Sequence, residues 1–407
     1  MTDSVETIIR EEIGRDRDYL VSLRRYFHQH PETACEEFGT AERIEAELRG
    51  IGLKTVRVGE TGVYAEIKGK AKGPDKTIVL RADIDALPVT EKHESPYKSL
   101  YEGKMHACGH DSHTAGLIGA ARYLARYLAR HTDLFPGTVR LTFQAGEEIG
   151  YGARVFIDKG YLDGADRCFG LHTDPRIPVG KVSLTPGPNN ASVDWFRITV
   201  RGKGAHIAYP QSGIDALYVA SQIVISAQLI VTKINSATEP LLLGIGKLTS
   251  GKAYNVIADE AVMEGTIRAA NPASRALTKK KLEEIAESTA TPYGATVSFE
   301  WKDNTSPLIN DRQATREAQA VAERLLGKEN IITDRPFSLG GDDFAEYIIK
   351  VPGVYAYVGT GNEKRPETLV AHHDCMFDID EDSLPIMAGL YAAYSVAYLS
   401  GCIEADK

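Results

Sequence analysis

Short apolar runs alternate with helical patterns through the first part of the chain. Apolar positions recur at helical spacing over residues 4–27, 40–48 and 114–127, which predicts three helices. Runs typical of strands lie between them, at 63–67, 77–80, 139–143 and 168–171. Strands that alternate with helices favour the α/β class, with a mostly parallel sheet and helices on both faces.

A second pattern begins after a segment rich in turn-forming residues at 181–190, which we interpret as a hinge. Strands and helices then follow as two β-α-β units, at 195–200, 215–231, 240–247, 261–269, 272–289 and 296–301. Helical patterns at 313–326 and 386–399 mark the return of the α/β pattern. We therefore predict a main domain formed by residues 1–188 and 304–407, with an inserted α+β domain at 189–303.

Composition narrows the class of protein further. The 407 residues are 43% hydrophobic and 25% charged, which is ordinary for a globular protein. A net charge of −9 without a basic block excludes a nucleic-acid partner. We find no run near the roughly 18 uncharged apolar residues of a membrane span, so no membrane partner is expected. The polar N-terminus and five scattered cysteines are typical of a cytoplasmic protein with reduced thiols.

The densest chemical cluster is 105–113, which reads Met-His-Ala-Cys-Gly-His-Asp-Ser-His. Its histidines, cysteine and aspartate are all side chains that can bind a metal. Cys108 and His110 are two residues apart, so in an extended segment they share a face, and Asp111 could orient a ligating imidazole. The alternative is a polar loop before a helix with Cys108 as a small buried filler, but the density of the cluster favours a metal site.

A second cluster follows the apolar run 139–143. Adjacent carboxylates at a strand end point in opposite directions, so one can bind a metal while the other acts as a general base. A solvated acidic turn is the alternative for such a pair taken alone. Other metal-type side chains follow the apolar runs 77–80 and 168–171 or lie just before Phe377, and that coincidence favours a shared site. The residues concerned are Glu147, Glu148, His172, Asp83, Asp85, His372 and His373.

The segments 81–88 and 105–111 resemble the metal-dependent amidohydrolase branch of the aminoacylase/carboxypeptidase superfamily. This branch contains hippurate hydrolase, N-acyl-amino-acid amidohydrolases and the auxin-conjugate (IAA-amino acid) hydrolases. The resemblance spans nearly the whole chain through further matches at 24–32, 202–206, 255–257, 265–268 and 377–378. It implies that the main domain is catalytic and that the inserted domain is a lid and dimerisation domain.

The resemblance also implies a site with two divalent ions. The implied ligands are Cys108 as the bridge, His110, Glu148, His172 and His373. His373 is chosen over His372 because the family's histidine lies four residues before the aromatic, here Phe377. Cysteine favours zinc or another borderline-soft ion such as manganese or cobalt over magnesium or calcium.

Several other positions match residues with roles in the family. Glu147 matches the general base that activates water and then protonates the leaving amine, and Asp85 matches an acid that supports the site. Asp83 stands where peptidase relatives have a metal-binding histidine, so it is left out of the ligand set. In the inserted domain, His206 matches a residue that polarises the scissile carbonyl, often across a dimer. Asn255 and Arg268 match substrate-binding residues.

Arg268 could pair with a substrate carboxylate in a bidentate manner. A salt bridge on the strand is the alternative for this residue. Departures from the family pattern at 145–149, 258, 341–344 and 374–375 leave the implied ligands intact and affect the expected substrate preference.

We therefore expect a binuclear enzyme that cleaves an N-acyl or N-aroyl amino acid, or a related small amide, into a carboxylate and an amine. We expect it to form a homodimer or a dimer-based homo-oligomer through the inserted domain. The enzymatic alternative is a dipeptidase or carboxypeptidase, whose substrate carries a free amino group. A binding or scaffold protein with a degenerate site on the same fold is the non-enzymatic alternative.

Overall fold

The computed structural model describes residues 5–131 and 134–403 and divides into two compact units. The first contains the described residues up to Gly187, then Ile309–Pro336 and those from Asp343 onward. The second contains Pro188–Leu308 and Phe337–Asp342. The second unit is thus inserted in the sequence of the first. The catalytic role of the first unit and the lid and dimerisation role of the second stay predictions.

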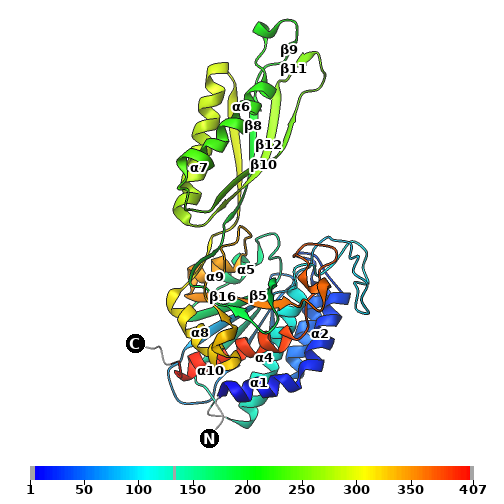
Figure 1. Ribbon diagram of the computed structural model, residues 1–407, viewed down its shortest axis with the longest axis vertical. Coiled ribbons are helices and arrows are strands. Elements are labelled where there is room, and N and C mark those ends of the chain that lie inside the picture. The colour runs from blue at the N-terminus through cyan, green and yellow to red at the C-terminus, as the bar shows by residue number, and fades with distance from the viewer. Residues whose placement is uncertain (1–4, 132–133, 404–407) are drawn as a thin grey trace. The chain divides into compact units, whose positions relative to one another are not determined.

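An eight-stranded mixed sheet forms the centre of the first unit (Figure 1). Its strands, in spatial order, are β1 (Thr55–Val58), β2 (Gly62–Lys68), β4 (Thr138–Gln144), β3 (Thr77–Asp83), β5 (Arg167–Pro178), β16 (Gly353–Gly361), β6 (Val182–Ser183) and β15 (Ile331–Ile332). The central strands β4, β3, β5 and β16 are parallel, whereas β1 and β2 run antiparallel at one edge and β6 is antiparallel to β16. The α/β class with a mostly parallel sheet is confirmed.

Helices cover both faces of this sheet. They are α1 (Val5–Arg15), α2 (Arg17–Gln29), α3 (Phe38–Gly50), α4 (His110–Arg130), α5 (Gly152–Asp158), α8 (Arg312–Leu326), α9 (Phe344–Lys350) and α10 (Ser383–Ser400). The helix α10 packs against α4, α1 and α8, while α5 packs against α9. In Figure 1 the α5 and α9 pair lies on the side of β5 and β16 opposite to α4 and α10. The sheet is therefore buried on both faces, as its apolar strands require.

Two local predictions differ from the structure. The single helix predicted over 4–27 is two helices that meet at Asp16, whose carboxylate binds Arg126 and Arg122 of α4; residue 4 lies outside the described residues. The central strand β16 was not predicted. All nine of its residues are buried, and periodicity alone does not distinguish a short apolar run of this kind from part of a buried helix.

The second unit is an antiparallel sheet with two helices. The sheet has the order β10 (Leu241–Ser250), β12 (Glu260–Ala269), β8 (Val193–Arg201) and β13 (Thr296–Thr305). Helices α6 (Ala216–Leu229) and α7 (Pro272–Ala290) follow β8 and β12, which gives the two predicted β-α-β units. The remaining short strands are β7 (Gly187–Asn190), β9 (Ala205–His206), β11 (Val256–Ile257) and β14 (Leu308–Asn310).

The helical segment Ala216–Ile234, formed by α6 and a π-helical turn, is long and apolar enough by length and composition to cross a membrane. Its most apolar window has a mean hydropathy of 1.5, so the expectation that no such run exists is wrong. Val219, Ile223 and Ala227 are buried in the core of the second unit. Because a core helix passes the same test, this finding alone is weak evidence for a membrane span.

Candidate metal centre

Predicted metal ligands and the predicted general base, Glu147, come together from four separate segments of the first unit. Glu147 and Glu148 follow β4, His172 lies in β5, and His110 begins α4. Three overlapping groups of side chains have their potential ligand atoms within 4.8 Å of one another. These groups are Cys108 with His110 and His172, Cys108 with Glu148 and His373, and His110 with Glu147 and Glu148. The carboxyl ends of neighbouring parallel strands bring these side chains to one edge of the sheet.

The hydrogen bonds of His110 leave one nitrogen for a ligand. Its Nδ1 donates to the backbone oxygen of Asp85 at 2.9 Å, whereas its Nε2 is buried and has no hydrogen-bond partner. Burial opposes protonation of this imidazole, but surrounding carboxylates, first Asp83 and then Asp85, raise its pKa to about 10. A field that stabilises a proton this strongly also stabilises a bound cation.

His172 has the same arrangement. Its Nδ1 donates to the backbone oxygen of Thr173 at 2.8 Å, and its Nε2 lies 3.5 Å from the Sγ atom of Cys108. Burial, together with the neighbouring imidazoles of His113 and His372, holds its pKa well below the ordinary value. The ring is therefore neutral, with the lone pair of Nε2 available to a metal.

The thiol of Cys108 is in an environment that requires a cation. Burial and the nearby carboxylates of Glu148 and Glu147 raise the pKa of this thiol well above its ordinary range. A thiolate, the form that binds metal, would be strongly disfavoured here without a positive charge. Metal binding at this site should therefore release a proton.

Glu148 and His373 complete the cluster. The Nε2 atom of His373 lies 3.3 Å from Oε1 of Glu148, and the backbone N–H of His373 donates to Ala107 next to Cys108. Burial would raise the pKa of Glu148, but His373 and His110 lower it below the ordinary value. His372 instead packs its ring on His172, with centroids 4.9 Å apart. The structure thus brings His373, rather than His372, to Glu148.

The two aspartates after the apolar run of β3 have different surroundings. The carboxylate of Asp85 lies 3.3 Å from Nδ1 of His110 and accepts from the backbone N–H of Glu148 at 3.0 Å, so it orients two neighbours. Asp83 binds His113 through one oxygen and Arg81 through the other. His113 accepts from the backbone N–H of Thr173 through its Nε2, so both of its nitrogens are engaged. Both oxygens of Asp83 and both nitrogens of His113 therefore already have partners.

Glu147 is buried beside this cluster. One of its carboxylate oxygens lies 3.4 Å from the backbone nitrogen of Asp343, which donates to it. A carboxylate oxygen of Glu147 also lies within 4.8 Å of potential ligand atoms of His110 and Glu148. This position is compatible with a carboxylate that works next to bound metal ions.

Two buried arginines support the cluster, and the sequence interpretation missed their role. Arg24 of α2 binds Asp111, next to His110, and Asp378, both at 2.8 Å. Arg81 in β3 binds Asp343 at 2.8 Å and Gln144 at 3.1 Å. The sequence could have indicated the role of Arg81, because it is the one charged residue in the run 77–82. An arginine buried in such a run requires partners for its charge.

The predicted substrate-binding residues lie in the second unit. His206 of β9 pairs with Val256 of β11, so it is close to Asn255, whose carbonyl accepts from the N–H of Ile207. The Nδ1 atom of His206 accepts from the N–H of Ala208 at 3.1 Å. The neutral ring therefore carries its proton on Nε2, as an exposed donor.

Arg268 lies in β12 and is partly buried. Among the described residues it forms no ion pair, so the alternative of a salt bridge on the strand is not observed. Burial lowers its pKa. A partly buried guanidinium without a carboxylate partner can accept one from a ligand.

The donor set fits a pair of divalent ions. The buried Nε2 of His110 lacks a hydrogen-bond partner, and a buried polar atom of this kind needs one. Sulfur, imidazole and carboxylate donors together suit zinc and neighbouring transition metals. All five cysteines are free thiols, so Cys108 is available as a ligand.

Comparison with known proteins gives the family. Residues 79–396 match peptidase family M20/M25/M40, and the chain belongs to this family. It is similar to an N-acetyl-L-cysteine deacetylase of Bacillus subtilis, with 39% identity over 95% of this chain and 90% of the relative. It is also 34% identical to thermostable carboxypeptidase 2 of Saccharolobus solfataricus, over 97% of this chain and 99% of the relative.

A solved structure supports the same assignment. A dinuclear metal-binding peptidase of the M20 family from Bacillus subtilis superposes with a TM-score of 0.82, at 34% identity over 95% of this chain and 99% of that one. The chain is therefore an enzyme, a metal-dependent amidohydrolase of this family.

Proposed function

We propose that this enzyme cleaves the amide bond of an N-acyl or N-aroyl amino acid, or of a related small amide, with two divalent ions. The observation that carries the proposal is the convergence of Sγ of Cys108 with the Nε2 atoms of His110 and His172, whose Nδ1 atoms are already bound. The similarity to an N-acetyl-L-cysteine deacetylase supports this class of substrate.

Five residues would hold the ions, namely Cys108, His110, Glu148, His172 and His373. Ions bound there supply the Lewis acidity that amide hydrolysis by water requires. Glu147 takes a proton from the attacking water through its carboxylate and returns it to the leaving amine. Asp85 holds His110 and the backbone of Glu148 in place. Zinc, manganese and cobalt are the metals that this donor set favours.

The second unit would supply substrate contacts. His206 donates from Nε2 to the oxygen of the scissile carbonyl, where negative charge develops in the transition state. Arg268 binds the carboxylate of the amino-acid part, and Asn255 contributes a further hydrogen bond. The free donor of His206 and the unpaired guanidinium of Arg268 support these roles.

We also propose that the enzyme is a homodimer, or an oligomer built from dimers, through the second unit. Helix α6 exposes large apolar side chains, namely Leu217, Tyr218, Ile225 and Leu229. Tyr218, Ile225 and Leu229 recur at spacings of seven and four residues, which places them on one face of the helix. A contiguous exposed apolar face of this kind is typical of a protein interface. The cytoplasmic location stays a prediction.

A hydrolysis assay separates this proposal from its enzymatic alternative. Metal-loaded enzyme is incubated with matched pairs of substrates, an N-acetyl amino acid and a dipeptide that carries the same C-terminal residue with a free amino group. Preference for the N-acetyl member in kcat/KM supports the proposal, and preference for the dipeptide supports the dipeptidase or carboxypeptidase. The similarity to a carboxypeptidase makes this comparison necessary.

A further inference from the structure

A separate pocket lies in the first unit beside the segment that leads to Glu147. It has a volume of about 210 Å³. Three segments form most of its wall: the turn between β1 and β2, the first part of α5, and the residue after β4. None of the proposed metal ligands lines it, so it is distinct from the candidate metal centre.

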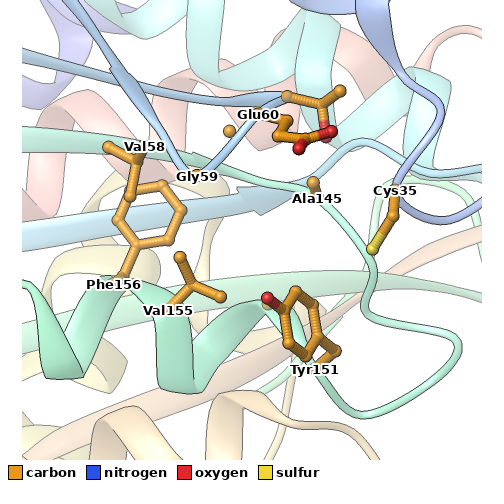
Figure 2. Close-up of a pocket in the computed structure, with 11 residues that line it drawn as sticks. Cys35, Val58, Gly59, Glu60, Ala145, Tyr151, Val155 and Phe156 are labelled. Atoms are coloured by element: carbon orange, nitrogen blue, oxygen red, sulfur yellow. The ribbon is translucent and has the colours of Figure 1, made fainter.

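Most of the pocket wall is apolar. Figure 2 shows Val58, Val155 and Phe156 together at one end, with Cys35 and Tyr151 at the other. An apolar cavity of roughly 150 Å³ is large enough to bind benzene. The pocket therefore has room for a six-membered ring or a short branched alkyl chain.

The charge at the pocket favours a cation. Glu60 is the only carboxylate among the lining residues, and no lysine, arginine or histidine lines the pocket. Glu60 is exposed and forms no ion pair with any described residue. The ring of Tyr151, which is 54% exposed, lies at the same pocket and can contribute a cation–π contact. A ligand carboxylate would face Glu60 without a positive partner.

Cys35 serves this pocket as a wall residue rather than as a nucleophile. Burial and the carboxylates of Glu37 and Asp85 raise the pKa of its thiol, which disfavours the reactive thiolate. Its backbone has a φ of 66°, and its Sγ would lie 3.4 Å from a Cβ atom at Gly146. The rate at which the Cys35 thiol is alkylated can therefore show whether the pocket is occupied, and the thiol itself is not needed to bind the ligand.

We propose that this pocket binds a small apolar cation, an aryl- or alkylammonium ion. The apolar body would lie among Val58, Val155 and Phe156, and the ammonium group would face Glu60 and Tyr151. A ligand of this charge differs from the carboxylate-bearing substrate proposed for the metal centre. The pocket is thus a second small-molecule site on the same unit.

Calorimetric titration with three matched probes tests the charge preference. The probes are benzylammonium, benzyl alcohol and benzoate, which share a ring and differ in charge. An exposed ion pair and a cation–π contact together predict that benzylammonium binds about tenfold more tightly than benzyl alcohol, with benzoate weaker still. The preference for benzylammonium over benzyl alcohol should fall in Glu60→Gln, where only the cation–π contact with Tyr151 remains, and should persist in full in the control Glu102→Gln, which changes another exposed carboxylate. Equal affinity for the three probes would overturn the proposal.

Two further measurements locate the bound probe. Val155→Trp fills the pocket and should abolish binding of benzylammonium, and unchanged binding in this folded variant would overturn the proposal. In the native chain, benzylammonium should slow alkylation of Cys35 by a maleimide, as followed by peptide mass spectrometry, without slowing that of the exposed Cys402. An unchanged alkylation rate at Cys35 would overturn the proposal even if Val155→Trp does not fold. Both measurements are made in Glu147→Gln as well, so their outcome is independent of hydrolysis.

Discussion

At the scale of single residues, the candidate centre depends on which nitrogen of each imidazole is already bound. The Nδ1 atoms of His110 and His172 both donate to backbone carbonyls, which fixes the tautomer and turns Nε2 towards the cluster. The sequence indicated His110 through the dense cluster at 105–113 and His172 through its place after the apolar run 168–171, and the family resemblance implied both as ligands. It could not predict their partners, because a backbone carbonyl leaves no trace in a pattern of side chains.

Separate substitutions of the two adjacent glutamates, Glu147 and Glu148, should distinguish an effect on catalysis from an effect on metal binding. Glu147→Gln removes the general base and should lower kcat by about 10²- to 10⁴-fold while metal content stays unchanged. Glu148→Gln is the matched control and should lose metal, because it removes a ligand. Steady-state kinetics and elemental analysis of both variants make the test. Full kcat in Glu147→Gln would exclude it as the base.

The pH dependence of stability should carry a contribution from Glu37. Its carboxylate accepts from Gly146 and from Thr61, and burial raises its pKa to about 7. The folded chain therefore holds this proton more tightly than the unfolded chain, where a glutamate titrates near pH ~4.3. The resulting stabilisation is present below that pH and is lost as the pH rises towards about 7.

Glu37→Gln should remove this dependence. Relative to the wild type, the variant should gain about 3–4 kcal/mol of unfolding free energy between acidic and mildly alkaline pH. Urea unfolding of metal-free protein at both pH values measures the change. Glu42→Gln, at an exposed position of the neighbouring helix α3, serves as the control. The same pH slope in Glu37→Gln and in the wild type would contradict the assignment.

At the scale of elements, strand ends and one helix start place the ligands. The periodic helices and the half-buried strands were predictable because burial on one face leaves a period in the sequence. The strand β16 was not predicted, because periodicity alone does not distinguish a short apolar run from part of a buried helix. The helix α4 begins after Gly109, which has a φ of 88° and separates Cys108 from His110. A Cβ atom there would lie 2.7 Å from Oγ1 of Thr173.

Gly109→Ala should therefore disturb the metal centre as well as the fold. Gly103→Ala is the matched control, since Gly103 has a φ of 79° but open space where a Cβ would lie. The control should cost only the strain of a left-handed backbone, about 1–2 kcal/mol. Gly109→Ala should cost more and also weaken metal affinity. Chemical unfolding and metal titration measure both effects, and equal costs with unchanged affinity would contradict this view.

At the scale of the whole molecule, two units are interleaved in one chain, and the proposed oligomer depends on the second. The sequence indicated the insertion through a change of pattern near 181–190. It could not indicate which face of α6 is exposed, because the segment Ala216–Ile234 is apolar along most of its length. In the structure only 28% of its most apolar window is buried. Exposure of Ile225 and Leu229 is visible only once the helix is packed.

A single charge on α6 should dissociate the proposed dimer. Ile225→Glu places a carboxylate in the apolar face and should shift the sedimentation of the protein from dimer to monomer. Ile349→Glu is a closely matched control, because Ile225 and Ile349 are both 67% exposed and Ile349 lies on α9 of the first unit. Sedimentation velocity distinguishes the two species. A wild type that sediments as a monomer would contradict the proposed assembly.

The central claim is that Cys108, His110, Glu148, His172 and His373 hold a pair of divalent ions. Its most direct test is the metal content of the purified protein after saturation with zinc, manganese or cobalt and removal of the excess. We predict about two ions per chain, as in other two-metal hydrolytic sites, and clear loss of metal in His110→Ala. A wild-type chain that retains no metal under any of these conditions would contradict the account.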